Sequence, residues 1–109
     1  MFQGMGGMNV GKLMKQAQEM QKKMAQVQEE LKERIVETSA GGGVVNVKVN
    51  GAQEIVDIKI AKEVINTDDK NMLEELVITA INEGIKKSRK MAESEIAKVT
   101  GGLNIPGMT

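Results

Sequence analysis

Residues 44–60, VVNVKVNGAQEIVDIKI, decide the fold. On each side of Asn50-Gly51, apolar residues alternate with polar ones, which is the pattern of a half-buried strand. Asn-Gly between two such runs is a strong β-hairpin signal and predicts a two-residue turn. That turn would place Val45 opposite Val56, so that the valines and isoleucines of both strands share one face. We therefore predict a hairpin with one apolar face and one polar face.

A hairpin of this kind is only marginally stable alone and needs a third strand and a helix. Residues 34–40, RIVETSA, are rich in β-branched side chains and predict the third strand, although the pattern leaves open which of its faces is buried. Gly41, Gly42 and Gly43 supply the turn into the hairpin. The prediction is a three-stranded antiparallel sheet.

Residues 11–33 predict the first of two long helices. Their apolar residues are spaced alternately by three and four positions over three heptads, with Gln, Lys and Glu elsewhere. An ordinary amphipathic helix on its own core fits this pattern, but the narrow stripe favours packing against another long helix. We expect that partner to be a second copy of the chain, although the sequence does not establish which helix mediates dimerisation. The predicted dimer interface consists of Leu13, Ala17, Met20, Met24, Val27 and Leu31.

Residues 70–99 predict the second helix, with Thr67, Asp68 and Asp69 as its N-cap and first-turn carboxylates. Thirty helical residues span about 45 Å, whereas a compact domain of this size has a radius of gyration of about 13 Å. The helix must therefore project beyond the sheet, bend, or lie along a partner. Its predicted inner face consists of Leu73, Val77, Ala80, Ile81 and Ile85.

The complete fold prediction is an α+β homodimer whose subunit has the order α-β-β-β-α, with two long projecting helices. We expect a flexible N-terminus at residues 1–10, a single domain at 11–100 and a C-terminal tail at 101–109. The expectation of a homodimer also follows from size, because a chain of 109 residues fills its own core poorly.

The composition narrows the function. The chain has nine Met and one Phe, but no Trp, Tyr, Cys or His. Without His or Cys the commonest general bases, nucleophiles and soft metal ligands are missing, so we expect no enzyme, no cofactor, no metal site and no small-molecule substrate. With Phe2 as the sole aromatic residue, stacking on single-stranded nucleic acid is disfavoured. We expect no membrane partner, because no apolar run approaches the length of a membrane span.

The formal net charge is zero, but the charges are sorted along the chain. Residues 1–23 carry four cations and one anion, residues 86–109 carry five and two, and residues 24–85 carry six and twelve. The first helix has lysines at its start and glutamates near its end, against its dipole, and a broken local rule of this kind points to function. If the two helices lie antiparallel, both basic ends meet at a tip far from the sheet.

These basic ends are the predicted DNA-binding surface, through contacts to phosphates. The same side chains could instead form ion pairs at i,i+4 spacing on solvated helix faces, and charge alone does not separate the two interpretations. The residues predicted to bind DNA are Lys12, Lys15, Lys22, Lys23, Lys86, Lys87, Arg89 and Lys90.

Four stretches resemble the YbaB/EbfC family of bacterial nucleoid-associated proteins, in the order that the family has them. They are 13–24, LMKQAQEMQKKM; 41–51, GGGVVNVKVNG; 72–82, MLEELVITAIN; and 100–107, TGGLNIPG. The resemblance implies an α-β-β-β-α subunit, a homodimer with projecting helical arms, and double-stranded DNA binding in the cytoplasmic nucleoid, with an influence on nucleoid organisation and gene expression. It implies no catalytic residues and supplies no short DNA-contact motif, so the predicted contacts depend on the charge argument.

The alternative function is a protein-interaction adaptor that does not bind DNA directly. In that case, the Met-rich helices would grip a helix of another protein, a use for which flexible methionine side chains are suited. The sequence establishes neither a preferred DNA sequence, nor the affinity, nor which genes are regulated, nor whether a protein partner matters more than DNA.

Overall fold

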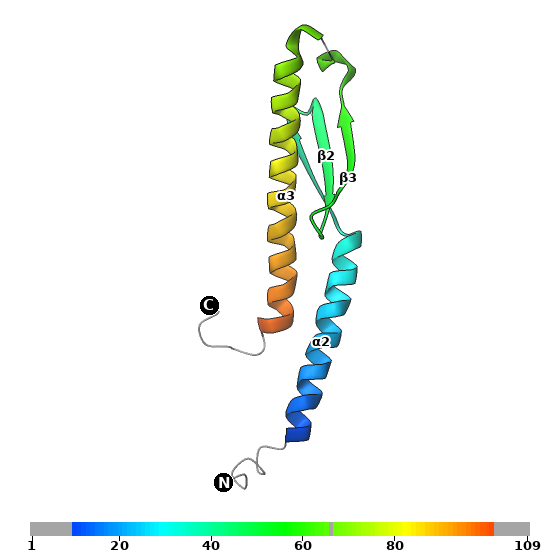
Figure 1. Ribbon diagram of the computed structural model, residues 1–109, viewed down its shortest axis with the longest axis vertical. Helices are drawn as coiled ribbons and strands as arrows, with labels where there is room; N and C mark the ends of the chain where they lie inside the picture. Colours follow the sequence, from blue (N-terminus) through cyan, green and yellow to red (C-terminus); the bar gives the residue numbers. More distant parts are fainter. Residues whose placement is uncertain (1–9, 66, 102–109) are drawn as a thin grey trace.

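The computed structural model describes residues 10–65 and 67–101 of the chain, and it confirms the predicted order α-β-β-β-α (Figure 1). The expected flexible N-terminus and most of the expected C-terminal tail lie outside these residues. None of the described helices has both the length and the apolar character needed to cross a membrane. The elements are α2 (Val10–Glu33), β1 (Ile35–Ala40), β2 (Val45–Asn50), β3 (Ile55–Ile60), two short 3-10 helices (Lys62–Val64 and Thr67–Asp69) and α3 (Lys70–Thr100).

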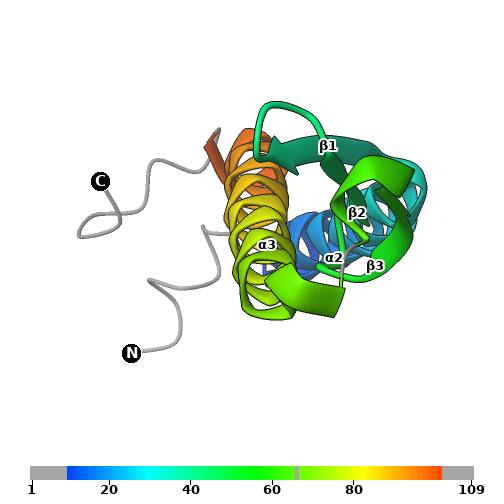
Figure 2. The ribbon, with the colours of Figure 1, turned by 90° about the horizontal axis from the view of Figure 1, so that it is seen from above.

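The sheet is antiparallel, in the order β1-β2-β3, and α3 packs against β1 and β2 (Figure 2). The core lies between them, because Val45, Val47 and Val49 of β2 are completely buried against α3. In β1 the inward residues are Val36, Thr38 and Ala40, which decides the face that the sequence pattern left open.

Helix α3 approaches the sheet closely because small residues line its inner face. Ala80, Gly84 and Ser88 are buried at four-residue spacing. A Cβ atom on Gly84 would lie 2.7 Å from Cγ2 of Val49, and the Thr38 hydroxyl donates a 2.8 Å hydrogen bond to the Ala80 carbonyl. The predicted inner face included Ala80 but missed Gly84 and Ser88, because neither residue contributes to an apolar pattern.

The predicted register of the hairpin was wrong. Val45 pairs with Ile60 rather than with Val56, and a four-residue loop at 51–54 replaces the two-residue turn. The apolar pattern nevertheless survives, because Val47 and Ile58 also pair directly and therefore share a face. A bulge next to Lys48 absorbs the remaining mismatch between the strands.

The cause of the longer loop is a set of contacts that a local pattern does not contain. The Asn50 side-chain oxygen accepts hydrogen bonds from the backbone N–H groups of Ala52 and Glu54, at 2.9 and 3.0 Å. The Gly51 N–H donates a 2.7 Å hydrogen bond to the Leu31 carbonyl at the end of α2. Gly51 thus docks the loop against α2 instead of forming the tight turn, and a Cβ atom there would lie 2.5 Å from that carbonyl oxygen.

The two long helices run antiparallel beyond the sheet (Figure 1). The molecule measures 77 × 25 × 17 Å, and its radius of gyration of 21.6 Å far exceeds the value of about 13 Å for a compact chain of this size. Helix α3 ends alongside the middle of α2, so the N-terminal half of α2 extends beyond it (Figure 1). The prediction of long projecting helices is therefore confirmed.

Candidate nucleic-acid interface

The first group of cations lies on one face of α2. At about 100° per residue, Lys12, Lys15, Lys22 and Lys23 fall within a sector about 100° wide, next to the apolar stripe on the Lys23 side. All four residues are exposed, and the first turn of the helix contains no acidic residue. We call these four lysines the α2 basic face. The helix therefore presents four lysines to solvent on one face.

The second group lies in the middle of α3 rather than at its end. The Lys87 ammonium donates a 3.3 Å hydrogen bond to the Glu37 carbonyl of β1, and the buried Ser88 hydroxyl donates to the Asn50 carbonyl of β2. This stretch is consequently held beside the sheet. We call it the α3 basic group; it consists of Lys86, Lys87, Arg89 and Lys90.

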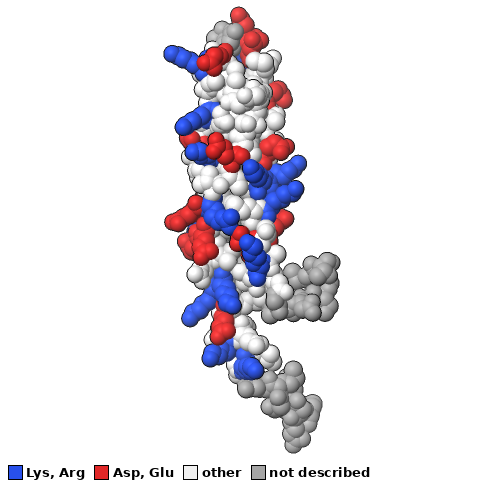
Figure 3. Space-filling view, turned by 180° about the vertical axis from the view of Figure 1, so that it is seen from behind, with Lys and Arg blue, Asp and Glu red and all other residues white. Residues whose placement is uncertain are grey.

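The prediction that both basic ends meet at one tip was wrong. The first five turns of α3 cover the sheet, so the α3 basic group lies there, while the α2 basic face runs from the projecting half of α2 to Lys23 beside the end of α3. Figure 3 shows basic side chains at several levels along the molecule, rather than at one end only. The chain therefore carries two separate cationic surfaces.

Ion pairs within the described residues leave most of these cations without a carboxylate partner. The four ion pairs are Lys32–Glu29 at 3.2 Å, Lys70–Glu74 at 3.8 Å, Lys98–Glu95 at 3.2 Å, and Arg34–Glu95. The i,i+4 pairs that the sequence allowed for Lys15, Lys23 and Arg89 are not among them. This arrangement favours cations that contact an external anion over cations neutralised on the helix surface.

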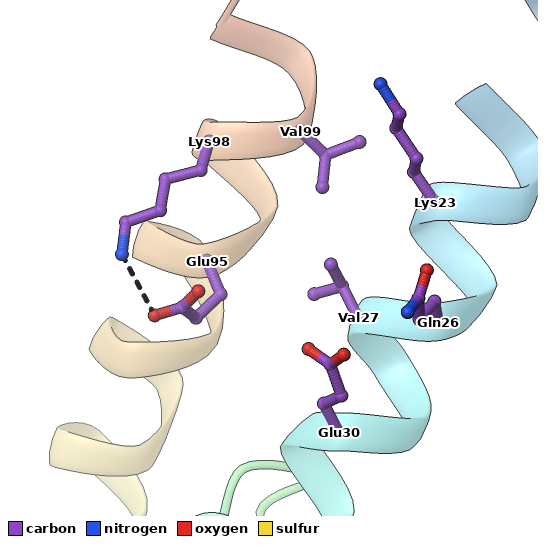
Figure 4. A pocket seen from close by; sticks show the side chains of 7 residues that line it. All are labelled: Lys23, Gln26, Val27, Glu30, Glu95, Lys98 and Val99. Carbon is purple, nitrogen blue, oxygen red and sulfur yellow. Dashed lines mark hydrogen bonds and ion pairs between the residues drawn. The ribbon is translucent and has the colours of Figure 1, made fainter. Parts of the chain in front are cut away.

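A cleft of about 320 Å³ separates the two helices where they run side by side (Figure 4). It is lined by Lys23, Gln26, Val27, Glu30, Glu95, Lys98 and Val99. At its edge Glu95 accepts hydrogen bonds from Arg34 and Lys98, and these bonds, chiefly the one from Arg34, lower the pKa of the Glu95 carboxyl. The Arg34–Glu95 contact ties the start of β1 to α3. Sequence reasoning missed it because the two residues are 61 positions apart.

The predicted interface residues of α2 divide into two sets. Leu31 is buried within its own chain at 4% exposure, and Met20, Met24 and Val27 are half-buried. Leu13 and Ala17 lie on the projecting half of α2 and are exposed. The C-terminal part of the apolar stripe thus packs within the subunit, whereas its N-terminal part, at Leu13 and Ala17, is exposed to solvent. We call this N-terminal part the outer end of the stripe.

A second apolar surface is open on β3. Helix α3 packs mainly against β1 and β2, and Ile58 and Ile60 of β3 remain 41% and 36% exposed although they share a face with the buried valines of β2. On α3, the neighbouring Ile78 is 52% exposed. A groove of about 520 Å³ on this side is lined by Ile60, Leu73, Glu74, Glu75, Val77 and Ile78. We call it the β3–α3 face.

The described residues contain no cluster of three or more carboxylates close enough together to hold a metal ion. The described residues form an elongated α-β-β-β-α subunit with exposed cations on two long helices and an open apolar face.

Comparison with known proteins identifies the group to which this subunit belongs. The family model described as the YbaB/EbfC DNA-binding family matches residues 5–103, and the chain belongs to this family. The resemblance noted in the sequence is thereby confirmed.

Relatives match along nearly the whole chain. The chain is 51% identical over 108 residues to a "Nucleoid-associated protein" of Acetivibrio thermocellus, covering 98% of this chain and 95% of the relative. It is 48% identical over 102 residues to "Nucleoid-associated protein DP1429" of Desulfotalea psychrophila, covering 94% and 96%. Among solved structures, protein HP0035 of Helicobacter pylori aligns with a TM-score of 0.69 at 28% identity, covering 77% of this chain and 88% of that one.

Proposed function

We propose that the chain is a nucleoid-associated protein that binds double-stranded DNA as a homodimer and contacts phosphates through its basic helices. The observation that carries this proposal is the α2 basic face: exposed lysines on one side of a projecting helix, with Lys15, Lys22 and Lys23 forming no ion pair in the described part of the chain. Membership of a DNA-binding family supports the same conclusion. The proposed location is the cytoplasmic nucleoid, with an influence on DNA organisation and gene expression.

The dimensions of the α2 basic face fit a short segment of duplex. Lys12 and Lys23 are eleven residues apart, which corresponds to about 16 Å along a helix, or about five base pairs. If the three lysines without ion pairs each neutralise one phosphate, log K falls against log salt with a slope of about −2.7 per subunit. Binding should therefore be salt-sensitive, and weak for a single subunit. The three lysines of the α3 basic group would add phosphate contacts at a second position.

Dimerisation would offset this weakness by presenting two sets of helices to one duplex. The outer end of the α2 stripe, at Leu13 and Ala17, remains one proposed contact between copies. The other open apolar surface is the β3–α3 face, and we propose that a second copy covers it. Large exposed apolar patches with polar rims mark protein interfaces.

The charges of α3 favour a second copy as the occupant of the β3–α3 face. Glu74 and Glu75 line the rim of the groove, and Arg89 lies four turns further along the same helix. In a two-fold contact, the acidic end of α3 from one copy can lie beside Arg89 of the other. A surface that carries both charge signs in this way is complementary to itself.

The experiment that tests the proposed function is a salt titration of binding to two unrelated duplexes, with the particle mass measured in parallel by light scattering. We expect similar affinities for both duplexes, a steep loss of affinity as salt rises, and the mass of a dimer. A protein that binds neither duplex at low salt, or whose affinity is independent of salt, would contradict phosphate contact. A monomer that binds normally would contradict only the dimer.

A second candidate function is a helical protein-interaction adaptor without direct DNA binding. The observation in its favour is the exposed apolar surface at the projecting end of α2, where Val10, Leu13 and Met14 are 50%, 46% and 60% exposed. An apolar contact with a partner helix would survive nuclease and high salt, whereas a complex held through DNA would not. Binding of purified protein to purified duplex decides between the two functions.

A further inference from the structure

One carboxylate lies in the middle of the α2 basic face. At about 100° per residue, Lys15 and Lys22 lie about 30–50° to one side of the centre of the face, and Lys12 and Lys23 lie at similar angles on the other side. Glu19 lies within about 10° of the centre. On the projecting half of α2, Figure 3 shows acidic surface among the basic side chains. Lysines therefore flank this glutamate on both edges of the face.

A role in stabilising the helix does not account for Glu19. Lys15 and Lys23 lie one turn away on either side, at the i,i+4 spacing that permits ion pairs, yet Glu19 forms none within the described residues. The side chain is exposed. In a surface that binds phosphates, a free carboxylate repels the ligand unless it faces a different part of the DNA.

The arrangement matches a helix lying in the major groove. The groove is about 12 Å wide, and an α-helix with its side chains has a diameter of about 10–12 Å. Lysines on the two edges of the α2 basic face can then reach phosphates of the two strands, while the centre of this face points at the base edges. Glu19 therefore faces hydrogen-bonding groups of the bases rather than phosphates.

We propose that Glu19 reads a base edge by accepting a hydrogen bond from the exocyclic amino group of cytosine; this inference rests on the proposed DNA binding. In the major groove only cytosine N4 and adenine N6 are donors. Adenine places the N7 acceptor beside its amino group, which repels the second oxygen of a carboxylate. Guanine and thymine present acceptors to the groove, so Glu19 disfavours them. The lysines thus supply affinity, and Glu19 supplies a preference for one base.

The test compares base preference in the wild type with that in Glu19→Ala and Glu19→Gln, in the full chain. Each protein selects from a pool of randomised duplexes, and affinities are then measured on duplexes that differ at the enriched position. The control is Glu63→Gln, which removes the same charge at an exposed position of the 3-10 helix Lys62–Val64. Far-UV circular dichroism checks that helix content is unchanged.

We expect the wild type and Glu63→Gln to prefer cytosine at one position by about five- to tenfold, the lower end of the range for a good base contact. Glu19→Ala should lose this preference, and Glu19→Gln should shift it towards adenine, with which an amide pairs. The proposal is overturned if the wild type binds without any base preference, if Glu19→Ala keeps the same preference, or if Glu19→Ala only binds every duplex more tightly. Failure of the wild type to bind any duplex would instead overturn the proposed function.

Discussion

The packing of α3 on the sheet leads to a sharp prediction about Gly84→Ala. An alanine in a helix interior is more favourable than a glycine by about 1 kcal/mol, so on helix propensity alone the variant should be more stable. The added Cβ atom, however, would lie 2.7 Å from Cγ2 of Val49 and 3.0 Å from the hydroxyl of Thr38. Val49 is completely buried, so its side chain is surrounded by other atoms. Overpacking a filled core costs about 1–3 kcal/mol.

The two effects leave an expected net loss of about 1 kcal/mol in the free energy of unfolding. Gly84→Val, which adds more atoms at the same point and lacks the propensity gain, should lose about 3 kcal/mol. The assay is urea unfolding followed by circular dichroism at fixed protein concentration. The dependence of the unfolding free energy on urea concentration is compared between variants, because equal slopes mean that a shift in the urea midpoint reports a change in stability. The control is Gly11→Ala, the same change at an exposed position of α2. If Gly84→Ala is as stable as Gly11→Ala, the close contact between α3 and the sheet is wrong.

Three further predictions follow from the contacts described above. Asn50→Ala should destabilise the fold by about 1–3 kcal/mol in the same unfolding assay, because two loop N–H groups lose their acceptor; equal stability would refute this role. Hydrogen bonds lower the pKa of Glu95 in the folded state, so the ionised Glu95 carboxylate stabilises the fold at pH values above its ordinary pKa of 4.5. This contribution to stability disappears as the pH falls through the lowered pKa. Wild type should therefore lose more stability than Glu95→Gln on acidification below pH 4.5, and parallel losses would contradict the Arg34–Glu95 tie. Ile78→Asp should convert a dimer into a folded monomer in light scattering, whereas an unchanged mass would exclude the β3–α3 face as the interface.

Much of the fold could be predicted because the informative patterns are local. The alternation around Asn50-Gly51 indicated two strands, and the apolar spacing of residues 11–33 indicated a helix that the structure places at Val10–Glu33. The hairpin register could not be predicted in the same way. It depends on a hydrogen bond from Gly51 to Leu31 and on the Asn50 side chain, and the first of these joins elements that are distant in the sequence.

The positions of the charges illustrate the same limit. The sequence correctly indicated basic residues on both helices. The prediction that these residues meet at one tip, however, assumed that α3 projects from the sheet as far as α2 does. Close packing at Ala80, Gly84 and Ser88 instead fixes the first five turns of α3 on the sheet. No apolar pattern reveals a helix face made of Ala, Gly and Ser. The central position of Glu19, by contrast, is a matter of helix periodicity alone, so the sequence already contains it.

Contact between the α2 basic face and DNA phosphates is central to the proposed function. The direct measurement is the slope of log K against log salt for a variant with three α2 lysines replaced by glutamine, compared with a control that removes the same charge elsewhere. The variant replaces Lys15, Lys22 and Lys23. The control replaces Lys48, Lys59 and Lys62, on the sheet and the following 3-10 helix.

Each lost phosphate contact lowers the magnitude of the slope by about 0.9, so the α2 variant should lower it by about 2.7 per subunit and bind every duplex more weakly. The control should change the slope by less than about 0.9, the value of one phosphate contact. A slope that is unchanged in the α2 variant, or that falls equally in both proteins, would contradict phosphate binding by this helix.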